Sequence, residues 1–119
     1  MHNFKDLKVW QKSVDLAVVI YHITSAFPSE EKFGLVSQMR RASISVSSNI
    51  AEGCAKSSKK SFSNSLEISL GECFELEAQT EICKRIGLIA EDSYIQITTA
   101  ANEIQKMIMG LKYSLEKNS

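Results

Sequence analysis

The sequence predicts an all-α protein, an antiparallel up-down-up-down four-helix bundle. Apolar residues recur at steps of three and four in four segments, and this is the period of one helix face. The segments contain almost no glycine or proline, the links are short, and no stretch alternates like a strand. We expect one domain over residues 1–119, with helices at about 6–26, 31–54, 59–86 and 93–116.

The first predicted helix is apolar on more than one side. Two apolar stripes lie next to each other, so residues 16–21 are apolar all round. In a short chain this favours a contact with another subunit as well as a contact inside the bundle. Asp6 is the expected N-cap, and Phe27-Pro28 ends the helix. The first stripe is Leu7, Trp10, Val14, Ala17, Tyr21 and Thr24, and the second is Leu16, Ile20 and Ile23.

The second predicted helix is rich in small and polar residues. Ser29 is the expected cap, Glu30 and Glu31 suit the helix dipole in the first turn, and Gly53 is the expected stop. One face is apolar and consists of Met39, Ala42, Val46 and Ile50. The neighbouring face is polar and consists of Gln38, Arg41, Ser45, Asn49 and Glu52.

The connection to the third helix combines serines with lysines. Ser57 or Ser58 can cap that helix, and Lys59 and Lys60 fall in its first turn, against the dipole preference. Backbone N–H groups, hydroxyls and lysines together suit a phosphate group, so Lys56, Lys59 and Lys60 form a candidate anion site. The alternative is a solvated turn whose lysines keep the protein soluble.

The last two predicted helices have regular apolar seams. Lys84 and Arg85 precede Gly87, a typical helix stop, and Ser93 with Gln96 matches a capping box. The third helix has the seam Phe62, Leu66, Ser69, Cys73, Leu76, Thr80 and Cys83. The fourth has Tyr94, Ile97, Ala101, Ile104, Ile108, Leu111 and Leu115.

Charge and cysteine usage narrow the class of protein. The formal net charge is zero, although nine Lys/Arg against five Asp/Glu leave residues 1–60 at +4, and residues 61–119 at −4. The two halves can pair inside one bundle. No apolar run is long enough to span a membrane, and the polar N-terminus favours a cytoplasmic protein. Free buried thiols are expected at Cys54, Cys73 and Cys83, rather than a disulfide or metal site.

No catalytic constellation emerges from the sequence. His2 and His22 belong to no metal-binding pair, and no phosphate loop or nucleophile motif is present. Helical spacing makes Glu72 and Glu75 near neighbours, within reach of Arg41 in an antiparallel hairpin. We therefore expect a structural polar seam that fixes helix register, with no catalytic residue, metal or cofactor. This polar seam comprises Gln38, Arg41, Ser45, Asn49, Glu52, Glu72 and Glu75.

Several segments follow the pattern of a known family. They are residues 4–12, Phe27-Pro28 with Glu31, residues 33–35, residues 37–42, residues 45–53, and Gly71 with residues 75–77. The chain resembles the bacterial four-helix bundle family found in intervening sequences of large-subunit ribosomal RNA genes. The resemblance implies a ring-like homopentamer and a relation to the accessory variability determinant protein of diversity-generating retroelements. It carries over no enzymatic activity. The chain departs from the pattern in its neutral charge and in Glu72 after Gly71.

Three functions compete at this stage. The first is a non-enzymatic, self-assembling bundle that acts as scaffold or adaptor toward a protein partner and touches RNA or DNA through a local basic patch. The second is a dedicated nucleic-acid-binding protein, associated with rRNA intervening sequences or a reverse transcriptase. The third is an enzyme, such as a nuclease that uses the carboxylates. The candidate nucleic-acid contacts are Arg40, Lys56, Lys59 and Lys60. Arg40 contributes if it points outward, and Arg41 is the better candidate for the inward position.

Overall fold

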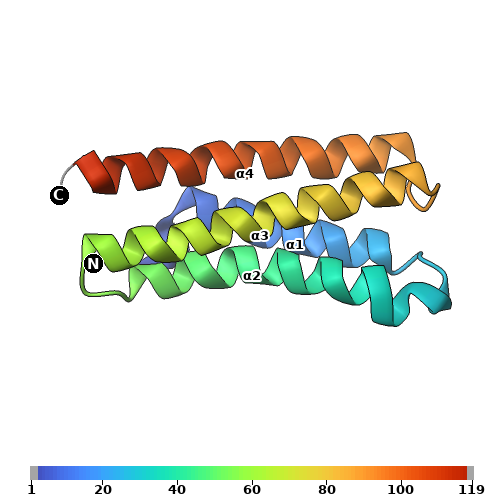
Figure 1. Cartoon of the computed structure of the whole chain (residues 1–119), viewed down its shortest axis with the longest axis horizontal. Helices are drawn as coiled ribbons and strands as arrows, with labels where there is room; N and C mark the ends of the chain where they lie inside the picture. Colours follow the sequence, from blue (N-terminus) through green and yellow to red (C-terminus); the bar gives the residue numbers. More distant parts are fainter. Residues whose placement is uncertain (1–2, 118–119) are drawn as a thin grey trace.

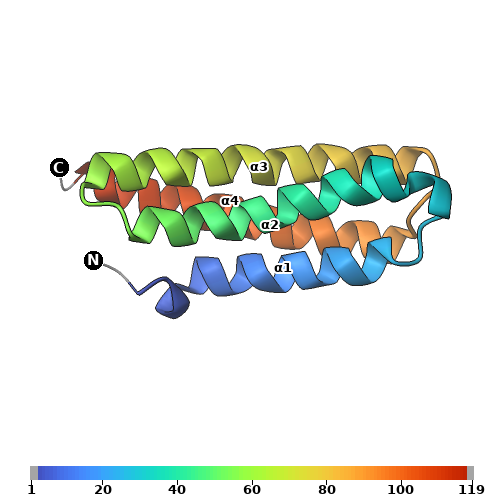
Figure 2. The same ribbon diagram turned by 90° about the horizontal axis from the view of Figure 1, so that it is seen from below.

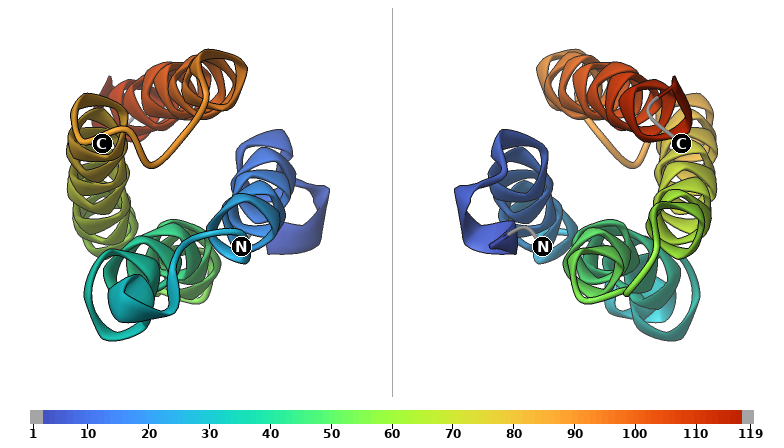
Figure 3. Two further views of the ribbon diagram at one scale, coloured as in Figure 1. Left: turned by 90° about the vertical axis from the view of Figure 1, so that its right-hand side faces the viewer. Right: turned by 90° about the vertical axis from the view of Figure 1, so that its left-hand side faces the viewer.

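A computed structural model describes residues 3–117 and contains four long helices with no strand in that range. They are α1 (Lys8–Thr24), α2 (Ser37–Cys54), α3 (Lys59–Arg85) and α4 (Glu91–Lys117). Successive helices run antiparallel, and α1 also packs against α4, so the bundle closes (Figures 1 and 2). The end-on views show the helices at the corners of a square, with α1 diagonally opposite α3 (Figure 3). The predicted fold class is confirmed.

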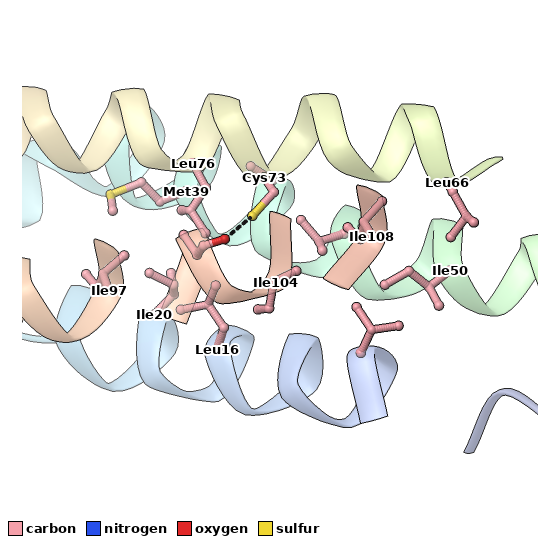
Figure 4. Close-up of a cluster of buried hydrophobic side chains, with 14 of the residues drawn as sticks. Leu16, Ile20, Met39, Ile50, Leu66, Cys73, Leu76, Ile97, Ile104 and Ile108 are labelled. Atoms are coloured by element: carbon pink, nitrogen blue, oxygen red, sulfur yellow. Dashed lines mark hydrogen bonds between the residues drawn. The ribbon is translucent and has the colours of Figure 1, made fainter. Parts of the chain in front are cut away.

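The core is built from one stripe of each helix (Figure 4). The predicted apolar face of α2 and the whole predicted seam of α3 are buried. In α4, Ile97, Ala101, Ile104 and Ile108 are fully buried. All three cysteines are free and buried, as predicted.

The core face of α1 differs from the expected heptad stripe. The buried residues are Val9, Ser13, Leu16, Ile20 and Thr24. Of the predicted stripe, only Thr24 is buried, and Tyr21 is exposed. The sequence is ambiguous because α1 is apolar on both faces. Ser13 is tolerated in the core because its hydroxyl donates to the carbonyl of Val9 at 2.6 Å.

The segment before α2 is the largest departure from prediction. A 3₁₀ turn at Ser29–Glu31 and a π-helical turn at Lys32–Val36 replace the first turns of the expected helix. Gly34 has non-helical backbone angles, φ −108° and ψ −108°, which kink the chain there. Ser29 therefore caps no long helix, and α2 begins only at Ser37.

Helix ends agree with the sequence prediction at some positions and differ at others. Ser58 caps α3 by accepting from the N–H of Ser61 at 3.1 Å. Gly87 has φ +78°, and the N–H of Leu88 donates to the backbone carbonyl of Cys83. Together these features form a Schellman motif that ends α3. Asp6 ends a 3₁₀ turn and caps nothing, since α1 begins at Lys8. The expected capping box at Ser93 is wrong, because α4 already begins at Glu91.

Small residues let α2 and α3 approach closely. Gly53 lies inside α2 and does not terminate it; a Cβ there would come within 2.7 Å of the ring of Phe62 and 3.0 Å of Cβ of Ser65. Further along the pair, the buried hydroxyl of Ser69 donates to the carbonyl of Val46 at 2.7 Å. The crowding of small residues in α2 is therefore explained by packing.

We expect Gly53→Ala to lower the free energy of unfolding by roughly 1–3 kcal/mol, because the buried ring of Phe62 has little room to move. Gly110→Ala is the matched control. It lies in α4 with nothing within 4 Å of its added Cβ, so it should raise stability by about 0.5–1 kcal/mol. Urea denaturation measures both. Equal effects of the two substitutions would contradict the close contact.

Candidate functional site

The polar seam is centred on Arg41. Its Nη1 lies 3.2 Å from both carboxylate oxygens of Glu72, and its Nη2 donates to Glu75. These hydrogen bonds, Glu72 first, raise the pKa of Arg41 above its ordinary value. The side chain of Arg41 is 54% exposed, so this is a surface ion-pair cluster and the expected inward position is wrong.

Only part of the predicted seam comes together. Asn49 donates to the carbonyl and hydroxyl of Ser45 within α2, at 2.8 and 3.0 Å, and does not cross to α3. Gln38 and Glu52 are exposed. Gln79 also joins the cluster, which was not predicted, because its Nε2 donates to Glu75 at 3.0 Å. Its Oε1 is buried and has no hydrogen-bond partner in the described part of the chain. The sequence signal that could have predicted the contact between Gln79 and Glu75 is the spacing of residues 72, 75 and 79, which places them on one face of α3.

Two more acidic side chains of α3, Glu77 and Glu81, are also engaged. Glu77 accepts from Gln105 at 2.9 Å, and Glu81 accepts from Tyr94 at 2.6 Å and from Arg85 at 2.9 Å. These bonds lower the pKa of Glu81, and the carboxylate raises the pKa of Tyr94. Within residues 3–117, no three His, Cys, Asp or Glu side chains form a group that could hold a metal ion. His2 lies outside this range, and His22 is exposed.

The buried thiols are not poised for nucleophilic chemistry. Burial raises the pKa of Cys73 and of Cys83 to about 11, so both are protonated near neutral pH. Cys73 donates to the carbonyl of Ala101 at 3.5 Å, a contact drawn in Figure 4, and Cys83 lies 3.5 Å from the sulfur of Met39. They act as small apolar core residues.

The candidate nucleic-acid contacts lie at two ends of the bundle. Lys56, Lys59 and Lys60 are exposed at the α2–α3 turn, which we call the basic turn. Lys56 and Lys59 line a recess of about 170 Å³ together with Ser57, Ser58 and Phe62. Arg40 lies in the first turn of α2, at the other end of that helix and about 24 Å away along its axis.

Arg40 also points differently from the expected outward position. It folds onto α1, where Nε donates to Thr24 at 3.0 Å and the guanidinium lies 4.4 Å from the ring centre of Tyr21. Arg40 is half-buried and Arg41 exposed, the reverse of the sequence expectation. Adjacent arginines on a helix point about 100° apart, and the sequence alone did not reveal which one α1 would cover.

The Arg41 cluster predicts a measurable coupling energy. A double-mutant cycle of Arg41→Ala and Glu72→Ala should give about 0.5–1 kcal/mol in 50 mM salt, because the pair is partly exposed. The coupling should shrink in 1 M salt. The matched control is the cycle of Arg41→Ala with Glu52→Ala, whose coupling should be near zero. Chemical denaturation of the wild type, the two single variants and the double variant measures each cycle, and equal couplings in the two cycles would contradict the contact.

Comparison with known proteins gives a consistent picture. The family model described as 23S rRNA-intervening sequence protein matches residues 5–110. A crystal structure of a protein of unknown function, from the S23 ribosomal protein family of Bacteroides thetaiotaomicron VPI-5482, is similar at a TM-score of 0.82 with 30% identity. The similarity covers 88% of this chain and 95% of that one. A search of curated proteins produced no match. The match over nearly the whole chain means that the chain belongs to the 23S rRNA-intervening sequence protein family.

Proposed function

We propose that the protein is a non-enzymatic, self-assembling bundle that acts as a cytoplasmic scaffold or adaptor for a protein partner. The observation that supports it is an apolar face on α3. Its four large side chains are between 46% and 58% exposed, and they fall within about 120° of the helix surface. Exposed Gly71 and Ala78 lie between them, and the charged side chains of Glu75 and Arg85 border the same sector. The large side chains of this α3 face are Ile68, Phe74, Ile82 and Ile86.

A second apolar face lies on α1. It shares Leu7, Trp10, Val14 and Tyr21 with the stripe that the sequence predicted as core and adds Val18; Val18 and Tyr21 are 50% and 41% exposed. Because α1 and α3 occupy diagonal corners (Figure 3), the two faces point in different directions. Two distinct faces favour head-to-tail contacts between copies, which close into rings. This arrangement suits the homopentamer that the resemblance implies. The α1 face comprises Leu7, Trp10, Val14, Val18 and Tyr21.

The charge distribution supports the same arrangement. Residues 1–58, which include α1 and α2, hold seven Lys/Arg and five Asp/Glu, a net charge of +2, and residues 59–119, which form α3 and α4, hold seven and nine, a net charge of −2. A head-to-tail contact places the basic half of one copy beside the acidic half of the next. Such complementarity favours association and opposes contacts between like faces.

Nucleic-acid contact is the second part of the proposal. The exposed lysines of the basic turn and the family's association with rRNA intervening sequences support it. No carboxylate lines the recess beside them. The alternative function, a dedicated nucleic-acid-binding protein working with an rRNA intervening sequence or a reverse transcriptase, relies on the same lysines. A relation to the accessory variability determinant protein belongs to this alternative.

Light scattering of the full chain tests the assembly. We expect a particle several times the 13.3 kDa monomer mass at micromolar concentration. Ile82→Glu should give monomers, because a charge would be buried in the contact. Ile95→Glu is the control, since Ile95 is equally exposed on α4 but lies outside both apolar faces. A monomeric wild-type protein would contradict the proposal.

Mixing two variants tests whether the contact is head-to-tail. Val18→Glu disables the α1 face and Ile82→Glu the α3 face, so each alone should be monomeric. A mixture retains one intact face of each kind and should form a heterodimer of about twice the monomer mass. A mixture that stays monomeric while both variants remain folded would exclude the head-to-tail contact.

Filter binding of single-stranded RNA at two salt concentrations tests the basic turn. Affinity should fall with salt, and Lys59→Glu with Lys60→Glu should abolish it without unfolding the protein. Lys60→Glu and Lys106→Glu, both at exposed lysines, form a matched pair with the same charge change. Only the first should weaken binding. Binding that is unaffected by salt, or lost equally in both, would refute the proposed site.

A further inference from the structure

Arg40 is held in place on α1 and has no counter-ion among residues 3–117. Its Nε donates to the hydroxyl of Thr24 at 3.0 Å, and its Nη2 lies 3.4 Å from the carbonyl of Tyr21. The ring of Tyr21 stacks against the guanidinium at 4.4 Å. Three groups on α1, the Thr24 hydroxyl and the carbonyl and ring of Tyr21, thus hold the Arg40 side chain in one orientation. Pre-organisation of this kind lowers the entropic cost of binding a ligand.

The charge of Arg40 is uncompensated within residues 3–117. Arg41 and Arg85 each form ion pairs with glutamates, whereas no carboxylate lies within ion-pair distance of Arg40 in this range. Two of the five guanidinium N–H donors are used, which leaves three for an acceptor. The half-buried guanidinium therefore keeps donors and a full charge that an anion can use.

The side chain lines a recess of about 210 Å³ between the end of α1 and the kinked segment before α2. Lys32 lines the same recess and also forms no ion pair with the residues described; its Nζ lies 5.6 Å from the ring centre of Phe33. Ser29 contributes a hydroxyl, and Phe27 and Val36 contribute apolar walls. Glu30 and Glu31 are neighbours in sequence but do not line the recess.

The irregular backbone brings the two cations together. In a regular helix, Lys32 and Arg40 would be separated by about 12 Å along the axis. The π-helical turn and the kink at Gly34 redirect the chain, so both side chains border one recess. The segment that departs most from the predicted helix is therefore also the segment that builds this recess.

We propose that this recess binds a phosphate group. The fork of Arg40 donates to two phosphate oxygens, Lys32 adds a point charge, and the Ser29 hydroxyl donates a further hydrogen bond. The site lies at the opposite end of α2 from the basic turn, and it goes beyond the proposed function because it requires neither self-assembly nor the lysines of that turn.

Calorimetric titration of the full chain with inorganic phosphate, at constant ionic strength, tests the site. Wild-type protein should bind with a Kd in the millimolar range or below. Arg40→Gln should weaken binding about tenfold, and Arg40→Lys should weaken it less, because it keeps the charge but loses the fork. Arg85→Gln is the control with the same charge change at an exposed arginine that already has a glutamate partner.

A second variant keeps the test decisive if Arg40→Gln fails to fold. Lys32 is exposed, so Lys32→Gln should leave the circular dichroism spectrum unchanged and weaken phosphate binding several-fold. Absence of binding by the wild-type protein, or equal affinity of Lys32→Gln and Arg85→Gln, would overturn the proposal. The particle mass should be the same with and without phosphate, so failure of assembly and failure of this site are distinguishable.

A parallel titration with a ten-nucleotide uridylate RNA identifies the source of the phosphate. Weakening of RNA binding by Arg40→Gln in step with phosphate would assign the group to a nucleic-acid backbone. Unchanged RNA binding with weakened phosphate binding would assign it to a small phosphorylated molecule. Both results support the recess as a phosphate site.

Discussion

The close approach of α2 and α3 is the constraint on which the rest of the structure depends. Gly53 faces the ring of Phe62, and Ser69 donates to the backbone of Val46, so two small residues set the distance and the register of the pair. With this register, Arg41 lies opposite Glu72 and Glu75. The surface ion pairs add little net stability, but they oppose sliding by a helical turn. The seam is best understood as a register device supported by backbone packing.

Periodicity predicted the core where a helix has a single apolar face. The predicted seams of α2 and α3 are buried because only one rotation of each helix buries apolar residues. α1 has two apolar stripes, so two rotations of the helix about its axis would each bury apolar residues. The stripe that contains Leu16 and Ile20 is the one that faces the core. The kink at Gly34 and the orientation of Arg40 depend on contacts between α1 and α2, which periodicity does not encode. Sequence reasoning therefore failed at the irregular segment that builds the candidate phosphate recess.

The ambiguity of α1 is itself informative about assembly. A helix whose second apolar stripe served no purpose would be expected to carry polar residues there, since they cost nothing at a solvated surface. The stripe instead continues from Leu7 to Tyr21, and α3 has an apolar face of its own on the diagonal corner. The two faces differ in sequence and lie in halves of opposite net charge, which is the combination that the proposed head-to-tail assembly requires.

A net charge of zero is a weak guide to anion binding in this bundle. Each acidic side chain of α3 from Glu72 to Glu81 accepts a hydrogen bond from a specific donor, so these charges are largely committed locally. Fields between exposed charges decay over about 8–10 Å at physiological salt, a short distance beside the length of α2. A phosphate group near Arg40 and Lys32 therefore responds to the nearby cations and scarcely to the acidic half. Local pairing of charges, more than their sum, determines where this protein can hold an anion.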